Sequence, residues 1–494
     1  MSARVVILLF ISLASSGFAP QSAVFPSATP VAPAPPKTAF RPTRVPSTAF
    51  HAPTTVDIRK RLSDVLAWQT STFAGAYDRV GRHSARWDAD ARKAFDLLAR
   101  GEAKDPARPG DLYDEAWYLL KNAIKAGSDD PLAKYELAYI SRGDTSRTAS
   151  AAAIRASALA LDRSAYPVYL RGVALIRAAN AVALSGSGLS KAEYAPIQRD
   201  ASAMLDRAQA AWALLVKDRA IPDSAMLSYI NELCETFVHA THRDRRQVFD
   251  PAFAAIKTAR DANDPILPVI QAAFFNKYAW DARGVEMAHE VAGSAWPDFL
   301  SRLAEAEKAI RVAVGHAPGD PAIPQLMMTI AGGTDSDLDE IIEWFKAGVV
   351  ANPGDHGLYD GMLNWTLPKW HGSFEDTEAL VRDAVATRNW SARVPLLVTD
   401  AHDDLSRLTP DWKYYYKLPF VCGEIAPVYD EFLTRYPNAG FDRGVYALRL
   451  TYCGRWQDAK RQIDLIAPDR LRIGAFGGQA AYEKTVESIA AHLK

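Results

Sequence analysis

The sequence lacks an excess of charge of either sign. Its 494 residues include 57 Lys and Arg and 58 Asp and Glu. This balance provides no long-range field that would attract nucleic acid or an anionic membrane, so we expect neither as a partner. Runs of five like charges are also missing. The densest basic stretch, residues 242–246, contains Asp244 and is predicted to be a solvated helix end.

Long apolar runs are absent too, apart from a short one at the N-terminus. Residues 5–14 are almost entirely apolar, follow Arg4 and precede the small residues of positions 15–19. This order is typical of a secretory signal peptide, and the run has about half of the ~20 residues that span a bilayer. We therefore predict a signal peptide over residues 1–23, no membrane span in the mature chain, and export to the periplasm or exterior of a bacterial cell.

Proline is concentrated near the N-terminus. Nine of the 30 prolines lie between residues 20 and 55, among many Ala, Ser and Thr. Proline removes backbone donors and fixes φ, and this composition offers little apolar surface to bury. We predict a Pro/Ala-rich disordered linker over residues 24–56.

No segment alternates apolar and polar residues between hairpin signals, which argues against a β-sheet. From residue 57 onward, stretches rich in Ala, Leu and Arg place apolar residues at helical spacing and end near Gly, Asp or Pro. We predict an all-α fold of stacked antiparallel helix pairs, a tetratricopeptide-like α-solenoid. Its expected parts are an N-terminal helical region (57–260), a helical repeat domain (261–390) and C-terminal helical hairpins (391–494).

One internal repeat supports this architecture. Ala-Pro-Gly-Asp at residues 317–320 returns as Asn-Pro-Gly-Asp at residues 352–355, 35 residues later. A period of about 34 residues with two helices is the tetratricopeptide signature. In such arrays neighbouring pairs share an apolar core that one pair cannot form alone.

Three motifs in the middle of the chain resemble an uncharacterised bacterial domain family, a domain of unknown function. They are Trp-Asp-Ala-Arg-Gly (280–284), Trp-Pro-Asp-Phe (296–299) and Leu-Pro-Lys-Trp-His-Gly-Ser (367–373). The family commonly has Gly where this chain has His371. The resemblance covers about a fifth of the chain. It implies helical repeats and no particular chemistry.

The third motif allows two interpretations. Pro368 ends one helix and Ser373 caps the next, so Trp370 is expected to wedge between the two helices. The alternative is a binding groove that combines aromatic and charged side chains. Its candidate residues are Trp280, Arg283, Trp365, Lys369, Trp370 and His371.

A second candidate site is a possible metal centre. Glu232, Glu235, His239 and His242 are spaced by three, four and three residues, which places them on one helix face. Carboxylates and imidazoles bind zinc, manganese or iron, but this order matches no named metal motif. The alternative is a hydrated helix face with Glu–His pairs. The sequence has no Ser-His-Asp, Cys-His or phosphate-loop arrangement, and we expect no cofactor.

The sequence predicts one free cysteine and one disulfide-bonded pair among its three cysteines. Cys234 lies in a helical pattern and is predicted to be a buried free thiol. Two helices joined by a turn at residues 437–440 are predicted between Cys422 and Cys453, with Pro427 in the first turn of the first helix. The open end of this hairpin brings the two cysteines together, and an oxidising compartment favours their disulfide.

Three functions remain open. The first is an exported, non-enzymatic binding or scaffold protein whose concave groove, lined by Trp, Tyr, Arg and Asn, recognises a peptide or protein partner. The second is a metal-dependent envelope hydrolase that uses Glu232, Glu235, His239 and His242. The third is a carbohydrate-binding protein that presents one face of the aromatic run Trp412–Tyr416 while the other face packs. The missing catalytic set favours the first, and the oligomeric state is left open.

Overall fold

The computed structural model describes residues 45–284, 290–334 and 337–494. The predicted signal peptide (1–23) and the first part of the predicted linker lie outside the described residues. Every regular element in the described ranges is a helix, which confirms the all-α prediction. The α-helices are α1 (Thr55–Thr72), α2 (Ala74–Val80), α3 (Asp88–Glu102), α4 (Leu112–Lys125), α5 (Pro131–Ile140), α6 (Arg147–Asp162), α7 (Val168–Ser185), α8 (Lys191–Leu215), α9 (Asp223–Thr241), α10 (Arg245–Ala259), α11 (Ile266–Arg283), α12 (Ala295–His316), α13 (Ala322–Gly333), α14 (Leu338–Ala351), α15 (His356–Thr366), α16 (Phe374–Ala386), α17 (Leu397–Arg407), α18 (Trp412–Tyr416), α19 (Pro419–Arg435), α20 (Gly440–Tyr452), α21 (Trp456–Asp464) and α22 (Gln479–His492). The short 3-10 helices are η1 (Ser47–Ala49), η2 (Val394–Leu396), η3 (Pro468–Arg470) and η4 (Ile473–Phe476).

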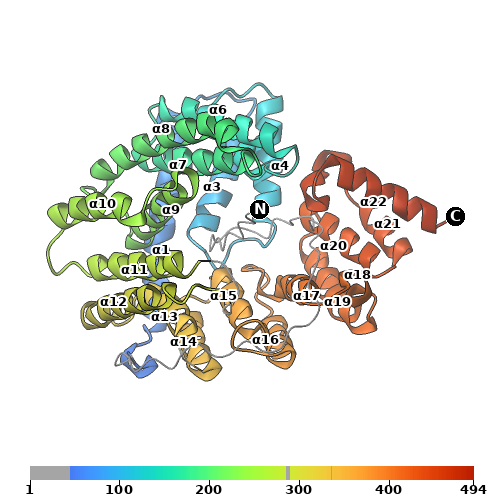
Figure 1. Ribbon diagram of the computed structural model, residues 1–494. Coiled ribbons are helices and arrows are strands. Elements are labelled where there is room, and N and C mark those ends of the chain that lie inside the picture. The colour runs from blue at the N-terminus through green and yellow to red at the C-terminus, as the bar shows by residue number, and fades with distance from the viewer. Residues whose placement is uncertain (1–44, 285–289, 335–336) are drawn as a thin grey trace.

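Successive helices pack against one another along the chain, as the predicted stacked pairs require. Helix α7 contacts α6 and α8, and α11 contacts α12. Figure 1 shows the pairs following one another around the molecule. Local signals set the helix starts: Ser190 forms a capping box with Glu193 at α8, and Asp130 caps α5. Each pair then buries the apolar stripe that its neighbour leaves uncovered.

The two Pro-Gly-Asp loops of the sequence repeat adopt the same geometry. The residue that directly follows the preceding helix is Ala317 in the first loop, with φ −146° and ψ 72°. In the second loop it is Asn352, with φ −147° and ψ 79°. The loop aspartate then accepts a hydrogen bond from the backbone N–H two residues on, at 2.8 Å for Asp320 and 3.1 Å for Asp355. At these two places the sequence period equals one helix pair.

Buried apolar side chains form two cores that meet at α11. The first extends from Phe73 to Phe274, and the second contains Val45 and Phe50 and then extends from Val269 to Ile489. The predicted boundary at residue 261 therefore lies close to the place where one core gives way to the next. The second core continues across the predicted boundary at residue 390, so the C-terminal hairpins share a core with the repeat region.

The predicted linker ends earlier than expected, because its last part is ordered. Val45 and Phe50 are buried in the second core. The backbone N–H of Val45 donates to Glu307 at 2.6 Å, and that of His51 donates to the Pro318 carbonyl at 3.0 Å. Two apolar side chains dock this segment although its average composition is that of a disordered chain. The prediction of disorder up to residue 56 was therefore wrong for residues 45–56.

Helix α7 is the one described helix that is long and apolar enough to cross a membrane. Of its 18 residues, 56% are buried inside the fold. It packs between α6, α8 and α9. The central helix of a folded core meets the same criteria of length and composition, so this finding does not oppose the prediction of a chain without a span.

The helix pairs follow a curved path that brings the two ends of the fold together. Figure 1 shows α20, in red, near α4, in cyan. The Nη1 atom of Arg470 lies 2.9 Å from the Oε2 atom of Glu115, although the two residues are 355 positions apart in sequence. This return of the chain creates the site described below.

Candidate functional site

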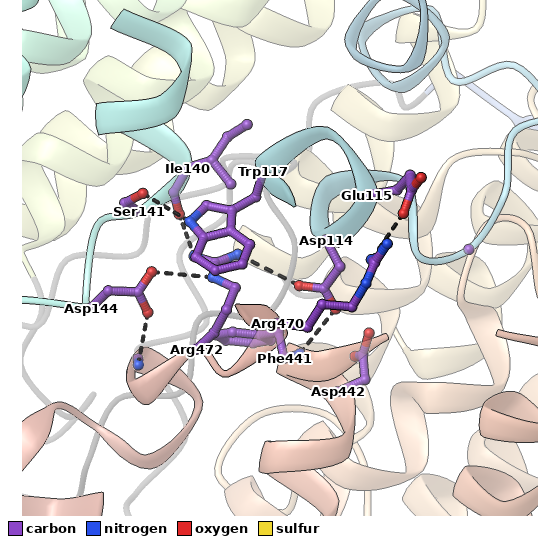
Figure 2. Close-up of polar contacts among 12 residues, drawn as sticks. Asp114, Glu115, Trp117, Ile140, Ser141, Asp144, Phe441, Asp442, Arg470 and Arg472 are labelled. Carbon is purple, nitrogen blue, oxygen red and sulfur yellow. Dashed lines mark hydrogen bonds and ion pairs between the residues drawn. The ribbon is translucent and has the colours of Figure 1, made fainter. Parts of the chain in front are cut away.

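Polar side chains join the two ends of the fold in what we call the closing contact, between helices α4–α5 with the loop after them and residues 470–474. Arg472 lies at its centre. Its Nε atom is 3.2 Å from Asp144 and its Nη1 atom is 3.6 Å from Asp114. Figure 2 shows the guanidinium between these two carboxylates and beside the Trp117 ring. One arginine thus holds both N-terminal carboxylates.

Backbone groups complete the closing contact. The Phe441 N–H donates to Asp114 at 3.0 Å, and the Gly474 N–H donates to Asp144 at 2.9 Å. Burial, together with the neighbouring carboxylate of Asp442, raises the pKa of Asp114. The contact is therefore built from buried, directional groups rather than from exposed ion pairs alone.

Next to the closing contact lies an inner cavity of about 80 Å³. This volume holds several water molecules or the end of a side chain. Both ends of the chain contribute to its wall, so the cavity exists only because the fold closes. The wall consists of Phe73, Leu98, Glu102, Gly110, Asp111, Tyr113, Asp114, Glu136, Tyr139, Ile140, Arg142, Arg177, Arg393, Phe441, Asp442 and Arg472.

Glu136 is a buried carboxyl group in the wall of the inner cavity. It projects from α5, is only 5% exposed, and accepts no hydrogen bond from the described residues. Burial raises the pKa of Glu136 to about 8, although Arg177 opposes the shift. The Tyr135 hydroxyl, on a small extension of the cavity, is also buried without a partner. Buried polar groups without partners are rare in folded proteins, and these two lie together.

Two arginines surround the aromatic part of the cavity wall. Arg177 lies 3.4 Å from Glu102 and 3.5 Å from Glu232. The guanidinium groups of Arg177 and Arg142 lie 4.9 Å and 4.3 Å from the ring centre of Tyr139. Among the described residues Arg142 has no carboxylate partner. The cavity wall thus contains a guanidinium that donates to the Tyr139 carbonyl but has no carboxylate partner, and a carboxyl group that accepts no hydrogen bond from the described residues.

The predicted groove residues of the middle motifs come together in a cluster around Arg283. The guanidinium lies 5.5 Å from the Trp280 ring and 5.3 Å from the Trp370 ring. Trp365 stacks edge-on against Trp370 at 5.3 Å and lies 5.7 Å from His371. The three motifs that are separate in sequence therefore form one aromatic cluster.

This aromatic cluster is packed rather than open. Trp365 is buried, and Arg283 is 7% exposed. His371 Nε2 lies 2.8 Å from the Gly332 carbonyl, which ties the motif to α13. Lys369 is exposed, and its positive charge acts on Asp404 of α17 rather than on the aromatic cluster. Trp370 packs edge-on against Trp280 of α11 and Trp365 of α15, so it contacts one of the two helices that flank the motif and a third helix, α11.

The carboxylates of the predicted metal set on α9 are paired with arginines. Glu232 contacts Arg177 in the inner cavity wall. Glu235 lies 3.0 Å from Arg245, which also holds Asp281 at 2.7 Å. A guanidinium at each carboxylate competes with any metal ion for the same oxygens.

The histidines of that set lie apart. His242 follows the end of α9 with a left-handed backbone of φ 57°, so the helical face does not extend to it. His239 is half-buried, its Nε2 atom has no partner, and burial lowers its pKa. The four residues do not bring three ligand atoms within 4.8 Å of one another. In the described part of the chain, the group that does so is His356, Asp360 and Asp400.

The structure joins Cys422 and Cys453 in a disulfide with a Cα–Cα distance of 6.2 Å, and Cys234 is a buried free thiol. Both agree with the predictions. The position of Pro427 was predicted wrongly, because α19 begins at Pro419 and Pro427 falls inside the helix. Gly423, four residues earlier, is exposed, so water can satisfy the carbonyl that loses its helical partner.

The aromatic run of α18 packs on one face. Tyr415 and Tyr416 are buried, and the Tyr415 hydroxyl lies 2.8 Å from His402 Nδ1. Trp412 packs edge-on against Tyr452 at 4.9 Å. Tyr414 alone is largely open, with 66% of its surface exposed. A single exposed ring offers little surface to a sugar.

Comparisons with known proteins assign the chain to no family. No protein-family model matches it, and no curated protein matches it either. The resemblance carried by the three middle motifs therefore stays a prediction.

The sequence contains a feature from which the inner cavity could have been predicted, namely single charged residues on apolar helix faces. Leu132, Ala133, Glu136 and Tyr139 lie at helical spacing on the buried face of α5, and Glu136 is the one charged residue among them. Arg177 is likewise the one charged residue between Gly172 and Ser185 of α7. A charge in the middle of an apolar stripe indicates a buried polar site, since burying it without a partner is costly.

Proposed function

We propose that this protein is an exported, non-enzymatic helical-repeat binding or scaffold protein. The inner cavity takes a side chain of a peptide or protein partner. The observation that carries the proposal is Glu136, a buried carboxyl group that faces a cavity and has no hydrogen-bond partner of its own. A partner group that donates a hydrogen bond to it would remove the cost of this unmet polar group.

The chemistry of the cavity wall limits the partner. Glu136 suits an amine or a guanidinium, whose positive charge would favour loss of the proton that burial retains on the carboxyl group, and the Tyr139 ring offers an apolar surface beside it. Arg142 and Asp111, which are half-buried, lie where the cavity opens to solvent and can hold the partner backbone or its charges. We therefore expect an extended segment that inserts one donating side chain, and neither nucleic acid nor lipid.

A site-specific photo-crosslinking experiment tests this proposal. A photoreactive phenylalanine analogue replaces Arg142 at the cavity, and in a matched variant it replaces Arg382, whose side chain is 70% exposed on α16. Irradiation in the native cell should give one discrete crosslinked protein from position 142 and none from position 382. Adding Glu136→Leu should abolish that product. Equal labelling from both positions, or labelling that persists with Glu136→Leu, contradicts the proposal.

A further inference from the structure

Three possible metal ligands meet between the repeat region and the C-terminal hairpins. His356 and Asp360 lie one turn apart on α15, and Asp400 lies on α17. The ligand atoms of all three lie within 4.8 Å of one another. His356 Nε2 is 3.2 Å from Asp360 Oδ1. Ligand atoms that each lie about 2 Å from one ion are at most about 4 Å apart, so the three side chains need only a small adjustment to share an ion.

The surrounding structure fixes the backbone of these ligands. The Asp355 side chain caps α15 immediately before His356, accepting from the Gly357 N–H at 3.1 Å. On α17, the residues on either side of Asp400, Thr399 and Ala401, are buried. Rigid helices, rather than a loop, therefore position the three side chains, as a preorganised site requires.

The hydrogen bonds of the neighbourhood leave these ligands available. Nearby Asp403 is held by Arg449 and Tyr416, and Asp404 is paired with Arg407. In contrast, Asp400 accepts no hydrogen bond from the described residues, and His356 directs its Nε2 atom toward Asp360. One imidazole thus faces two carboxylates that no arginine or lysine neutralises.

We propose that His356, Asp360 and Asp400 bind one divalent metal ion, with Zn²⁺ the preferred ion. One imidazole nitrogen and two carboxylate oxygens form a ligand set that suits Zn²⁺, with water in the fourth position. The ion links α15 to α17 and so joins the repeat region to the C-terminal hairpins. This site does not depend on the partner proposed for the inner cavity.

Calorimetric titration of the purified full chain with ZnCl₂ tests the site. The protein carries no polyhistidine tag and is first stripped of metal with a chelator. We expect one Zn²⁺ per chain and a rise in melting temperature that depends on Zn²⁺ concentration. Asp400→Asn and His356→Gln should each weaken binding at least tenfold, whereas His239→Gln, from the other histidine-containing set, should not change it.

Several results would overturn the assignment. Binding of less than one ion per chain by the wild type contradicts it, as does unchanged affinity in Asp400→Asn. Equal loss in His239→Gln contradicts it too, because binding would then lie elsewhere. Asp360→Asn is the second variant should Asp400→Asn fail to fold, since Asp360 is partly exposed and its exchange leaves the core intact. Full Zn²⁺ affinity in Asp360→Asn would mean that the three residues form only an ion-pair cluster.

Discussion

At the scale of single residues, buried charges near the inner cavity fall into paired and unpaired groups. Arg393 bonds both oxygens of Asp442, at 2.9 Å and 2.5 Å, and donates to the Gly110 carbonyl at 3.0 Å. Glu136 lies in the same cavity wall and has no such partner. Paired charges hold the two ends of the fold together, whereas Glu136 is the group that we propose a ligand would pair.

Exchange of Glu136 should change how stability depends on pH. Because the pKa of Glu136 is about 8 in the folded protein and near 4.5 when unfolded, the folded state holds an extra proton between these values. Its contribution to the free energy of unfolding therefore falls as pH rises from about 4.5 to about 8 and is level above that. Glu136→Gln should remove this fall and be more stable than the wild type at pH 8. Urea unfolding at pH 5, 7 and 9 measures the free energy of unfolding of both proteins. Parallel curves of this free energy against pH contradict the prediction.

Removing the partner of Asp442 should be strongly destabilising. Arg393→Met keeps most of the side-chain volume but leaves a buried carboxylate without its guanidinium, which costs roughly 3 to 5 kcal/mol. Arg382→Met, in an exposed pair with Glu378 at 3.8 Å, is the control and should cost less than about 1 kcal/mol. Urea midpoints of the two variants give the comparison. Equal small losses would mean that the Arg393–Asp442 pair does not hold the fold.

Sequence reasoning at this scale succeeded where both partners lie on one local unit. The Cys422–Cys453 pairing followed from the symmetry of a hairpin, and buried Cys234 followed from a helical pattern. It could not assign Glu232, because the neighbour that decides its role, Arg177, lies on another helix. The periodicity of one helix gives its buried face and does not identify what that face meets.

At the scale of elements, α19 and α20 form a hairpin closed by a disulfide. The cysteines are 31 positions apart in sequence. On the chain-entropy model, closing a loop of this size stabilises the fold by roughly 3 to 4 kcal/mol. The hairpin also supplies Phe441 and Asp442 to the inner cavity, so its stability bears on the site.

The double variant Cys422→Ser, Cys453→Ser should lose about that amount of stability. Reducing agent should lower the melting temperature of the wild type to a similar value and leave the double variant unchanged. Differential scanning calorimetry with and without dithiothreitol measures both effects. A wild-type melting temperature that does not respond to complete reduction of the disulfide would contradict the assigned contribution.

Close packing of α7 on α9 depends on a glycine. A methyl group on Gly172 would lie 2.1 Å from the Tyr229 hydroxyl, which donates to the Ala208 carbonyl at 2.8 Å. Gly172→Ala should therefore cost about 1 to 3 kcal/mol, and Tyr229→Phe in the same chain should recover part of it. Gly423→Ala is the control, because a methyl group there meets nothing within 4 Å. Equal unfolding midpoints for both alanine variants in urea would contradict the close contact.

The presence of helices and many of their ends could be predicted from the sequence, because capping residues and the spacing of apolar residues are local features. The loops at residues 317–320 and 352–355 are the best case, since the same four-residue pattern gives the same backbone angles. Two errors came from context. Pro427 was placed in a first turn because sequence alone did not indicate that α19 begins at Pro419, and the segment from Val45 docks through side chains that average composition hides.

At the scale of the whole molecule, the decisive feature is that the array of helix pairs closes on itself. The closing contact joins α4–α5 to residues 470–474. A second contact joins Lys104 to Asp355, 251 positions apart. Sequence patterns predicted the stacking but not the closure, because each contact pairs charged residues whose local sequence does not identify a partner hundreds of positions away.

Zero-length carbodiimide crosslinking with mass spectrometry is the most direct test of this closure. It forms an amide between a lysine and a carboxylate that are in contact. We expect crosslinks at Lys104–Asp355, and at the local pairs Lys60–Asp64 and Lys460–Asp464, which lie 2.7 Å and 2.6 Å apart and show that the reagent has worked. The local crosslinks without Lys104–Asp355, at a protein concentration that excludes links between molecules, would mean that the array is open and that the inner cavity does not form.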